Sequence, residues 1–196
     1  MRRLATLLLL APLTIAGAQG TASTYSMGEP SALEDSLLGI PSSSARARAV
    51  RSFAQTDDRA TLLSAMRIAR TIQNSEDKFR LLDTLAPRYL GSGDRTLHTA
   101  FFRVACSVPS SDELRDLLID VVPFAAKSDE LALAILDLAR IVPSSPDRSD
   151  VLTALVDSGA VRSNDVRESF ADVLQTIPGE QDRQRVARAA MKVVKE

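Results

Sequence analysis

The sequence predicts an all-α fold in which antiparallel helical hairpins stack into a right-handed superhelix with a period of about 35 residues. The first observation is a β-branched residue followed by a turn, which recurs at Ile40, Ile72, Val108, Val142 and Ile177. The intervals between these marks are 32, 36, 34 and 35 residues. A fixed period of roughly 20 to 50 residues is typical of stacked repeats. The second observation is an aspartate that recurs in the same phase, at Asp58, Asp94, Asp129 and Asp165.

The first 18 residues have the three parts of a secretory signal peptide. Arg2 and Arg3 give a positive start, and an almost continuous apolar run follows from Leu4 to Ile15. Small residues at 16–18 then suit signal peptidase. A membrane anchor is the alternative, but the run is shorter than the roughly 20 residues that a spanning helix needs. We expect cleavage near Ala18, a periplasmic or secreted location, no stable membrane insertion after cleavage, and a flexible leader over residues 19–31.

The helical repeat domain is predicted over residues 32–196, beginning with a short helix at 32–38 that covers the first repeat. Each repeat then has a first helix after the Ser-rich turn and a second helix that starts at the recurring aspartate. The first helices are expected at 44–54, 76–89, 112–125, 146–158 and 180–194. We expect the aspartates to be N-caps or first-turn residues, because a carboxylate there accepts hydrogen bonds from free backbone N–H groups.

Apolar residues in both kinds of helix recur at positions i, i+3, i+4 and i+7, which indicates one buried face per helix. Small residues precede the β-branched mark by three positions at Ala69, Ala105 and Ala139, where neighbouring helices can approach closely. The sequence shows neither the alternation of a strand nor the Asn-Gly pair of a hairpin. An all-α domain is therefore expected.

Paired helices with a period near 35 residues resemble the tetratricopeptide-type and HEAT-type α-solenoids, from about Ile40 to Glu196. The resemblance is one of architecture, because no unit carries the aromatic, Leu-Gly and Tyr set of the tetratricopeptide signature. Ala139 and Pro143 match parts of that signature. The resemblance implies a protein-binding scaffold, and it transfers no family's functional residues to this chain.

No set of residues in the sequence predicts catalysis, a cofactor or a metal site. His98 and Cys106 are the only histidine and cysteine, too few for a zinc site or a cysteine–histidine–acid set. We expect His98 to be a packed or half-exposed helix residue and Cys106 to pack as a small hydrophobe. Acidic pairs such as Asp112-Glu113 recur at helix starts, where capping explains them.

The charge distribution supplies the candidate binding residues. Without Arg2 and Arg3 the chain has 22 basic and 25 acidic residues, and a net charge of −3 argues against nucleic-acid binding. Arginines nevertheless gather in the first repeat, and we hypothesise that they bind another protein or peptide. Solvated helix faces with i,i+4 ion pairs are the alternative. The candidate partner-binding residues are Arg46, Arg48, Arg51, Arg59 and Arg67.

Together these patterns predict an exported, non-catalytic helical-repeat protein that mediates protein–protein interaction in the bacterial cell envelope, as a monomer or weak homo-oligomer. The absence of Trp and the aromatic content of 4% argue against a stacking platform for carbohydrate or nucleic acid. Two alternatives stay open. One is an accessory or catalytic domain of an envelope hydrolase system, and the other is a structural protein that self-assembles.

Overall fold

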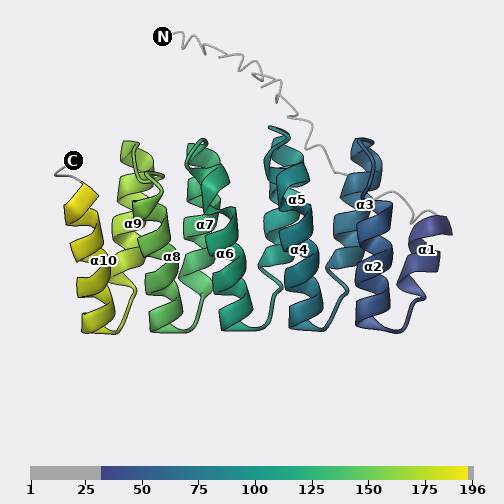
Figure 1. Cartoon of the computed structure of the whole chain (residues 1–196), viewed down its shortest axis with the longest axis horizontal. Coiled ribbons are helices and arrows are strands. Elements are labelled where there is room, and N and C mark those ends of the chain that lie inside the picture. Colours follow the sequence, from purple (N-terminus) through teal and green to yellow (C-terminus); the bar gives the residue numbers. More distant parts are fainter. Residues whose placement is uncertain (1–31, 194–196) are drawn as a thin grey trace, which may run out of the picture.

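The computed structural model describes residues 32–193, and within that range it contains ten α-helices and no strand (Figure 1). The all-α prediction is confirmed, whereas the predicted signal peptide and leader, residues 1–31, lie outside the described residues. Between residues 32 and 193 no helix has the length and apolar character needed to cross a membrane. The helices are α1 (Ala32–Leu38), α2 (Ser43–Phe53), α3 (Arg59–Ala69), α4 (Ser75–Leu90), α5 (Arg95–Ala105), α6 (Ser111–Ala125), α7 (Asp129–Ile141), α8 (Ser145–Asp157), α9 (Asn164–Gln175) and α10 (Glu180–Val193).

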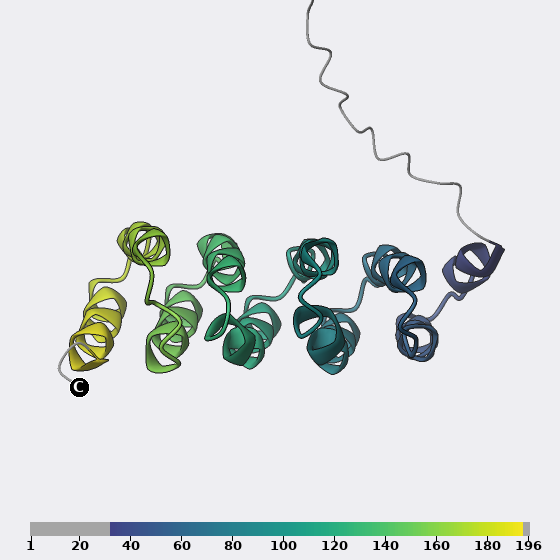
Figure 2. The same ribbon diagram turned by 90° about the horizontal axis from the view of Figure 1, so that it is seen from above.

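The helices lie in two rows, which are clearest from above (Figure 2). Helices α2, α4, α6, α8 and α10 form the first row, and α1, α3, α5, α7 and α9 form the second. Helices next to each other in a row are in contact, as α6 is with α8, and consecutive helices such as α4 and α5 are in contact across the rows. Successive helices therefore alternate between the rows along the chain.

Side-chain N-caps set the start of every helix from α2 to α9. Asp58 and Asp94 are the N-caps of α3 and α5, where their carboxylates accept hydrogen bonds from backbone N–H groups. Asp129 and Asp165 instead lie in the first turns of α7 and α9. The prediction that these aspartates are caps or first-turn residues is therefore confirmed.

The core lies between the two rows and is continuous along them. The residues predicted to mark the repeat and the small residues before them are completely buried at Ala69, Ile72, Ala105, Ala139, Val142 and Ile177. The buried Tyr89 hydroxyl donates a hydrogen bond to the Leu62 carbonyl, 2.6 Å away. Burial raises the pKa of Tyr89, so this hydroxyl stays a donor at neutral pH.

Candidate functional site

Basic side chains at the fourth residue of several first-row helices close the helical hairpins. The Arg46 guanidinium on α2 donates to the Thr71 carbonyl just after α3, at 3.2 Å, and to the Thr71 hydroxyl at 3.0 Å. Arg148 on α8 makes the same pair of bonds to Thr176 after α9, both at 2.9 Å. Carbonyls at helix C-termini have no partner within the helix, so these bonds satisfy groups that would otherwise be left unpaired.

Lys78 has the same position and role in α4. We call Arg46, Lys78 and Arg148 the closing cations. Its Nζ lies 2.9 Å from the Ser107 carbonyl oxygen and 3.0 Å from the Ser107 hydroxyl oxygen. Burial, and then the charge of Arg70, lowers the pKa of Lys78. Helix α6 carries Leu114 at the corresponding position, and Ile141 stands where the other hairpins have Thr or Ser. Apolar residues thus stand at both positions, with Leu114 buried and Ile141 exposed.

The five predicted partner-binding arginines lie on two helices in different rows. Helix α2 carries Arg46, Arg48 and Arg51, and α3 carries Arg59 and Arg67. Three of them hold the fold together: Arg46 is a closing cation, Arg59 lies 2.5 Å from Asp94, and Arg67 forms an ion pair with Glu34.

The other two arginines of this set have no ion pair with any residue in the range 32–193. Arg48 is exposed on α2, and Arg51 is half-buried with an Nε that lacks a hydrogen-bond partner there. Because the five side chains come from different rows and most have structural contacts, the structure does not bring them together as one site.

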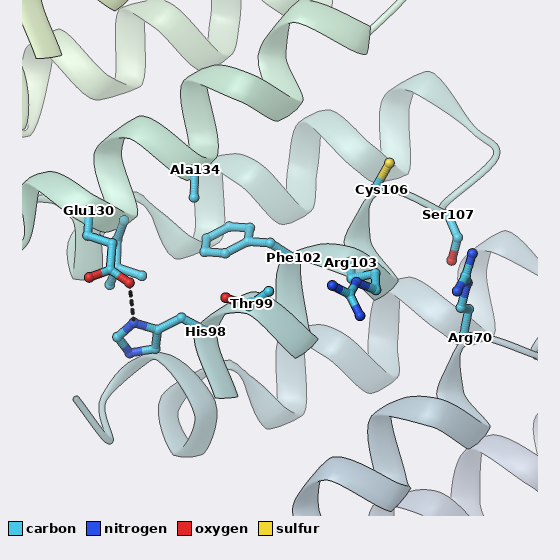
Figure 3. Close-up of a pocket in the computed structure, with 10 residues that line it drawn as sticks. Arg70, His98, Thr99, Phe102, Arg103, Cys106, Ser107, Glu130 and Ala134 are labelled. Atoms are coloured by element: carbon cyan, nitrogen blue, oxygen red, sulfur yellow. Dashed lines mark ion pairs between the residues drawn. The ribbon is translucent and has the colours of Figure 1, made fainter. Parts of the chain in front are cut away.

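A pocket of about 560 Å³ opens on the second row, where α5 meets its neighbours α3 and α7. We call it the α5 pocket, and the residues on which its chemistry depends are Arg70, His98, Phe102, Arg103, Cys106 and Glu130. Figure 3 shows His98 and Glu130 at one end, the Phe102 ring in the middle, and Arg103 and Arg70 toward the other end. The pocket therefore has two polar ends and an apolar centre.

The His98 imidazole is a buried polar group whose hydrogen-bonding capacity is not used. The residue is 7% exposed, and neither ring nitrogen has a hydrogen-bond partner among residues 32–193. Nδ1 lies 3.7 Å from Glu130 Oε1, which is longer than a hydrogen bond. Glu130 itself accepts a hydrogen bond from Arg95 at 2.5 Å. Leaving a buried polar group unsatisfied costs about 1–3 kcal/mol, so the imidazole favours a ligand that can bond to it.

The opposite end of the pocket has two positive charges without compensation. Arg70 and Arg103 are exposed, and neither guanidinium group has a hydrogen bond or an ion pair within the described residues. Arg140 in α7 corresponds to Arg70, because each stands two positions before the β-branched residue that ends its hairpin. Asp172 in α9 corresponds to Arg103, because each stands five positions before that residue. Arg140 and Asp172 form an ion pair at 3.8 Å. Between α7 and α9 the arginine thus faces a carboxylate, whereas between α3 and α5 a second arginine, Arg103, stands at the position of that carboxylate.

Cys106 is exposed beside the α5 pocket, so the prediction that it packs as a small hydrophobe is wrong. Ala105 takes the core position, and Cys106 is the C-cap residue that follows α5. His98 is packed as expected, eight residues earlier. At about 1.5 Å per residue the two lie roughly 12 Å apart along the helix, too far for the imidazole to activate the thiol.

Arg70 belongs to the arginine-rich first repeat but was not among the five candidates, and Arg103 was missed. That they line one pocket depends on how adjoining hairpins are offset. A signal was nevertheless present in the sequence. Alignment of the repeats on the β-branched residue places Arg70 at the same position as Arg140, and Arg103 at the same position as Asp172. The α4–α5 hairpin thus has a basic side chain, Arg103, where the α8–α9 hairpin has an acidic one, Asp172.

No three or more His, Cys, Asp or Glu side chains come together as a metal site within residues 32–193. Comparison of the chain with protein-family models, with curated protein sequences and with solved structures gives no match. What the α5 pocket can do is therefore inferred from its own geometry: it combines buried apolar surface, an unsatisfied imidazole and two free guanidinium groups.

Proposed function

We propose that the chain is an α-solenoid of stacked helical hairpins that acts as a non-catalytic protein-interaction scaffold, exported to the bacterial cell envelope. The two rows of helices support this architecture, because contacts along each row join neighbouring hairpins as in stacked repeats. Export is supported by the charged, apolar and small-residue segments of residues 1–18.

The observation that carries the binding role is the uncompensated positive charge at the α5 pocket. Other arginines join adjoining hairpins through ion pairs, as Arg59 does with Asp94 and Arg95 with Glu130, both at 2.5 Å. Arg70 and Arg103 make no such contact in the described chain. Guanidinium groups that are free, exposed and next to apolar surface suit an acidic segment of a partner protein.

The proposed binding face is therefore on the second row, at α3 and α5, and differs from the predicted one on α2 with Arg48 and Arg51. The test is a pull-down from an envelope extract of the source organism, with tagged residues 19–196 as bait. We expect one stoichiometric, salt-sensitive partner whose capture is lost in Arg103→Glu.

The matched control is Arg48→Glu, which reverses an exposed, unpaired charge on the first row and should leave capture unchanged. Circular dichroism should show that both variants fold like the parent chain. Loss of capture in Arg48→Glu alone would move the binding face to the first row. An empty pull-down with a folded bait would contradict the scaffold function itself.

A further inference from the structure

We propose that the α5 pocket binds an extended peptide segment of a partner protein, with an acidic side chain between Arg70 and Arg103 and an apolar residue against Phe102. The inference rests on the proposed scaffold function and names the chemistry that the scaffold recognises. It is built on three features of the pocket, namely its charge pattern, its buried imidazole and its length.

The charge pattern indicates a carboxylate, because the chain itself supplies one at the corresponding place. Between α7 and α9, Arg140 lies 3.8 Å from the Asp172 carboxylate and 3.9 Å from Asp137 in its own helix. Between α3 and α5 the corresponding side chains are Arg70 and Arg103. A carboxylate from a partner would therefore restore here the charge balance that the later hairpins have built in. Guanidinium groups bind carboxylates through directed, charge-assisted hydrogen bonds.

The imidazole at the other end indicates a peptide backbone rather than a small anion. His98 lines the pocket, is 7% exposed, and has no hydrogen bond at either ring nitrogen within residues 32–193. A neutral imidazole has one donor and one acceptor, and a peptide unit offers one of each. An isolated anion held by the arginines would leave the imidazole unsatisfied.

The length of the pocket fits a short extended segment. His98 and Cys106 lie roughly 12 Å apart along α5, and extended chain covers roughly 3.3–3.6 Å per residue, so three to four residues span the pocket. Side chains two positions apart on an extended segment point to the same side. The acidic residue at the arginine end and an apolar residue two positions before it would thus both face the pocket. Phe102, 8% exposed, gives the apolar residue its contact.

The chain's single histidine and single cysteine report separately on the two ends. The probe is acetyl-Ala-Leu-Ala-Asp-Ala-amide, titrated into residues 19–196. One readout is the NMR signal of the His98 ring, and the other is the rate at which iodoacetamide alkylates Cys106. We expect both to change with the same dissociation constant. The matched peptide with Asn in place of Asp should bind about tenfold more weakly, because it loses charge-assisted hydrogen bonds.

Two variants complete the test. Arg103→Gln should weaken binding of the Asp peptide about tenfold, and Arg140→Gln, which removes an arginine from the corresponding position on α7, should leave it unchanged. Both sites are on the surface, and the thermal unfolding midpoint checks that each variant folds. Equal binding of the Asp and Asn peptides, or no loss in Arg103→Gln, would overturn the assignment of a carboxylate site.

The two reporters also test the extended segment. A change at Cys106 without a change at His98 would reduce the site to a simple anion site and overturn the peptide assignment, as would inorganic phosphate if it produced both changes. Failure of the two proposals can be told apart. A partner captured in the pull-down without peptide binding would overturn the pocket chemistry alone, whereas peptide binding with no captured partner would overturn the scaffold function.

Discussion

Replacement of the closing cation Arg148 by leucine should destabilise the fold, because Arg148 donates to three acceptors at once. Its guanidinium donates to the Val142 carbonyl at 2.6 Å and to the carbonyl and hydroxyl of Thr176, both at 2.9 Å. The side chain is 9% exposed, so water cannot readily replace it. The change leaves these carbonyls without their donor.

The magnitude follows from these acceptors. A buried acceptor left without a donor costs about 1–3 kcal/mol, and Arg148→Leu leaves the Val142 carbonyl in this state. Thr176 is exposed, so water can partly replace the bonds that its carbonyl and hydroxyl lose. Leucine recovers part of this by apolar burial and by removing the cost of desolvating a cation. We therefore expect a net loss of about 1–2 kcal/mol in the free energy of unfolding.

The chain also contains the compensating change. In the α6–α7 hairpin, Leu114 takes the place of the cation and Ile141 takes the place of the hydroxyl residue. Arg148→Leu combined with Thr176→Ile reproduces that apolar pair. The double variant should lose less stability than the sum of the two single variants, with a coupling of about 1–2 kcal/mol.

The assay is urea unfolding followed by circular dichroism at 222 nm, with the slope of the transition compared among variants, because stacked repeats can unfold in more than one step. The control is Arg167→Leu on the exposed face of α9, expected to change stability by less than about 0.5 kcal/mol. An Arg148→Leu variant as stable as this control, or strict additivity in the double variant, would refute the closing-cation account.

Three further predictions concern single side chains. A hydrogen bond from Arg59 lowers the pKa of Asp94 to about 2, so the stability that this carboxylate contributes is present above pH 3.8 and is lost as the pH falls toward 2. Arg59→Gln should therefore raise the pKa of Asp94, which NMR of its carboxyl carbon measures. Burial, and then two neighbouring aspartates, raises the pKa of Asp120, so Asp120→Asn should stabilise the fold slightly at pH 7 and not below pH 3.8. A destabilised variant in urea unfolding at pH 7 would count against this repulsion. Gly159 has φ 71° and open space around its Cβ position, so Gly159→Ala should cost about 1 kcal/mol in urea unfolding through backbone strain alone.

The helices could be predicted from the sequence because their determinants are local. Asp94 caps α5 through bonds to the next few residues, and the apolar ladder of the same helix needs no knowledge of its neighbours. Cys106 shows the limit of this reasoning. It follows Ala105 in a small apolar pair, and a shift of one residue decides which of the two is buried.

The site was harder to predict because it depends on contacts between hairpins. A run of arginines near the N-terminal end suggested a common surface, yet Arg46 donates to a carbonyl 25 positions later and Arg59 pairs with a carboxylate 35 positions later. Composition cannot separate such structural arginines from free ones. Alignment of the repeats signals Arg70 and Arg103, but only the packing of adjoining hairpins places both in one pocket.

The hydrogen bonds and ion pairs that join the hairpins reach from 25 positions along the chain, in the Arg46–Thr71 bond, to 39 positions, in the Arg185–Pro146 bond. Each thus ends about one repeat from where it began. In the proposed stacked-repeat architecture, duplication or deletion of one hairpin, roughly 35 residues, would leave such contacts intact everywhere except at the new joint. In that architecture, recombination can lengthen or shorten the molecule in steps of one helical hairpin.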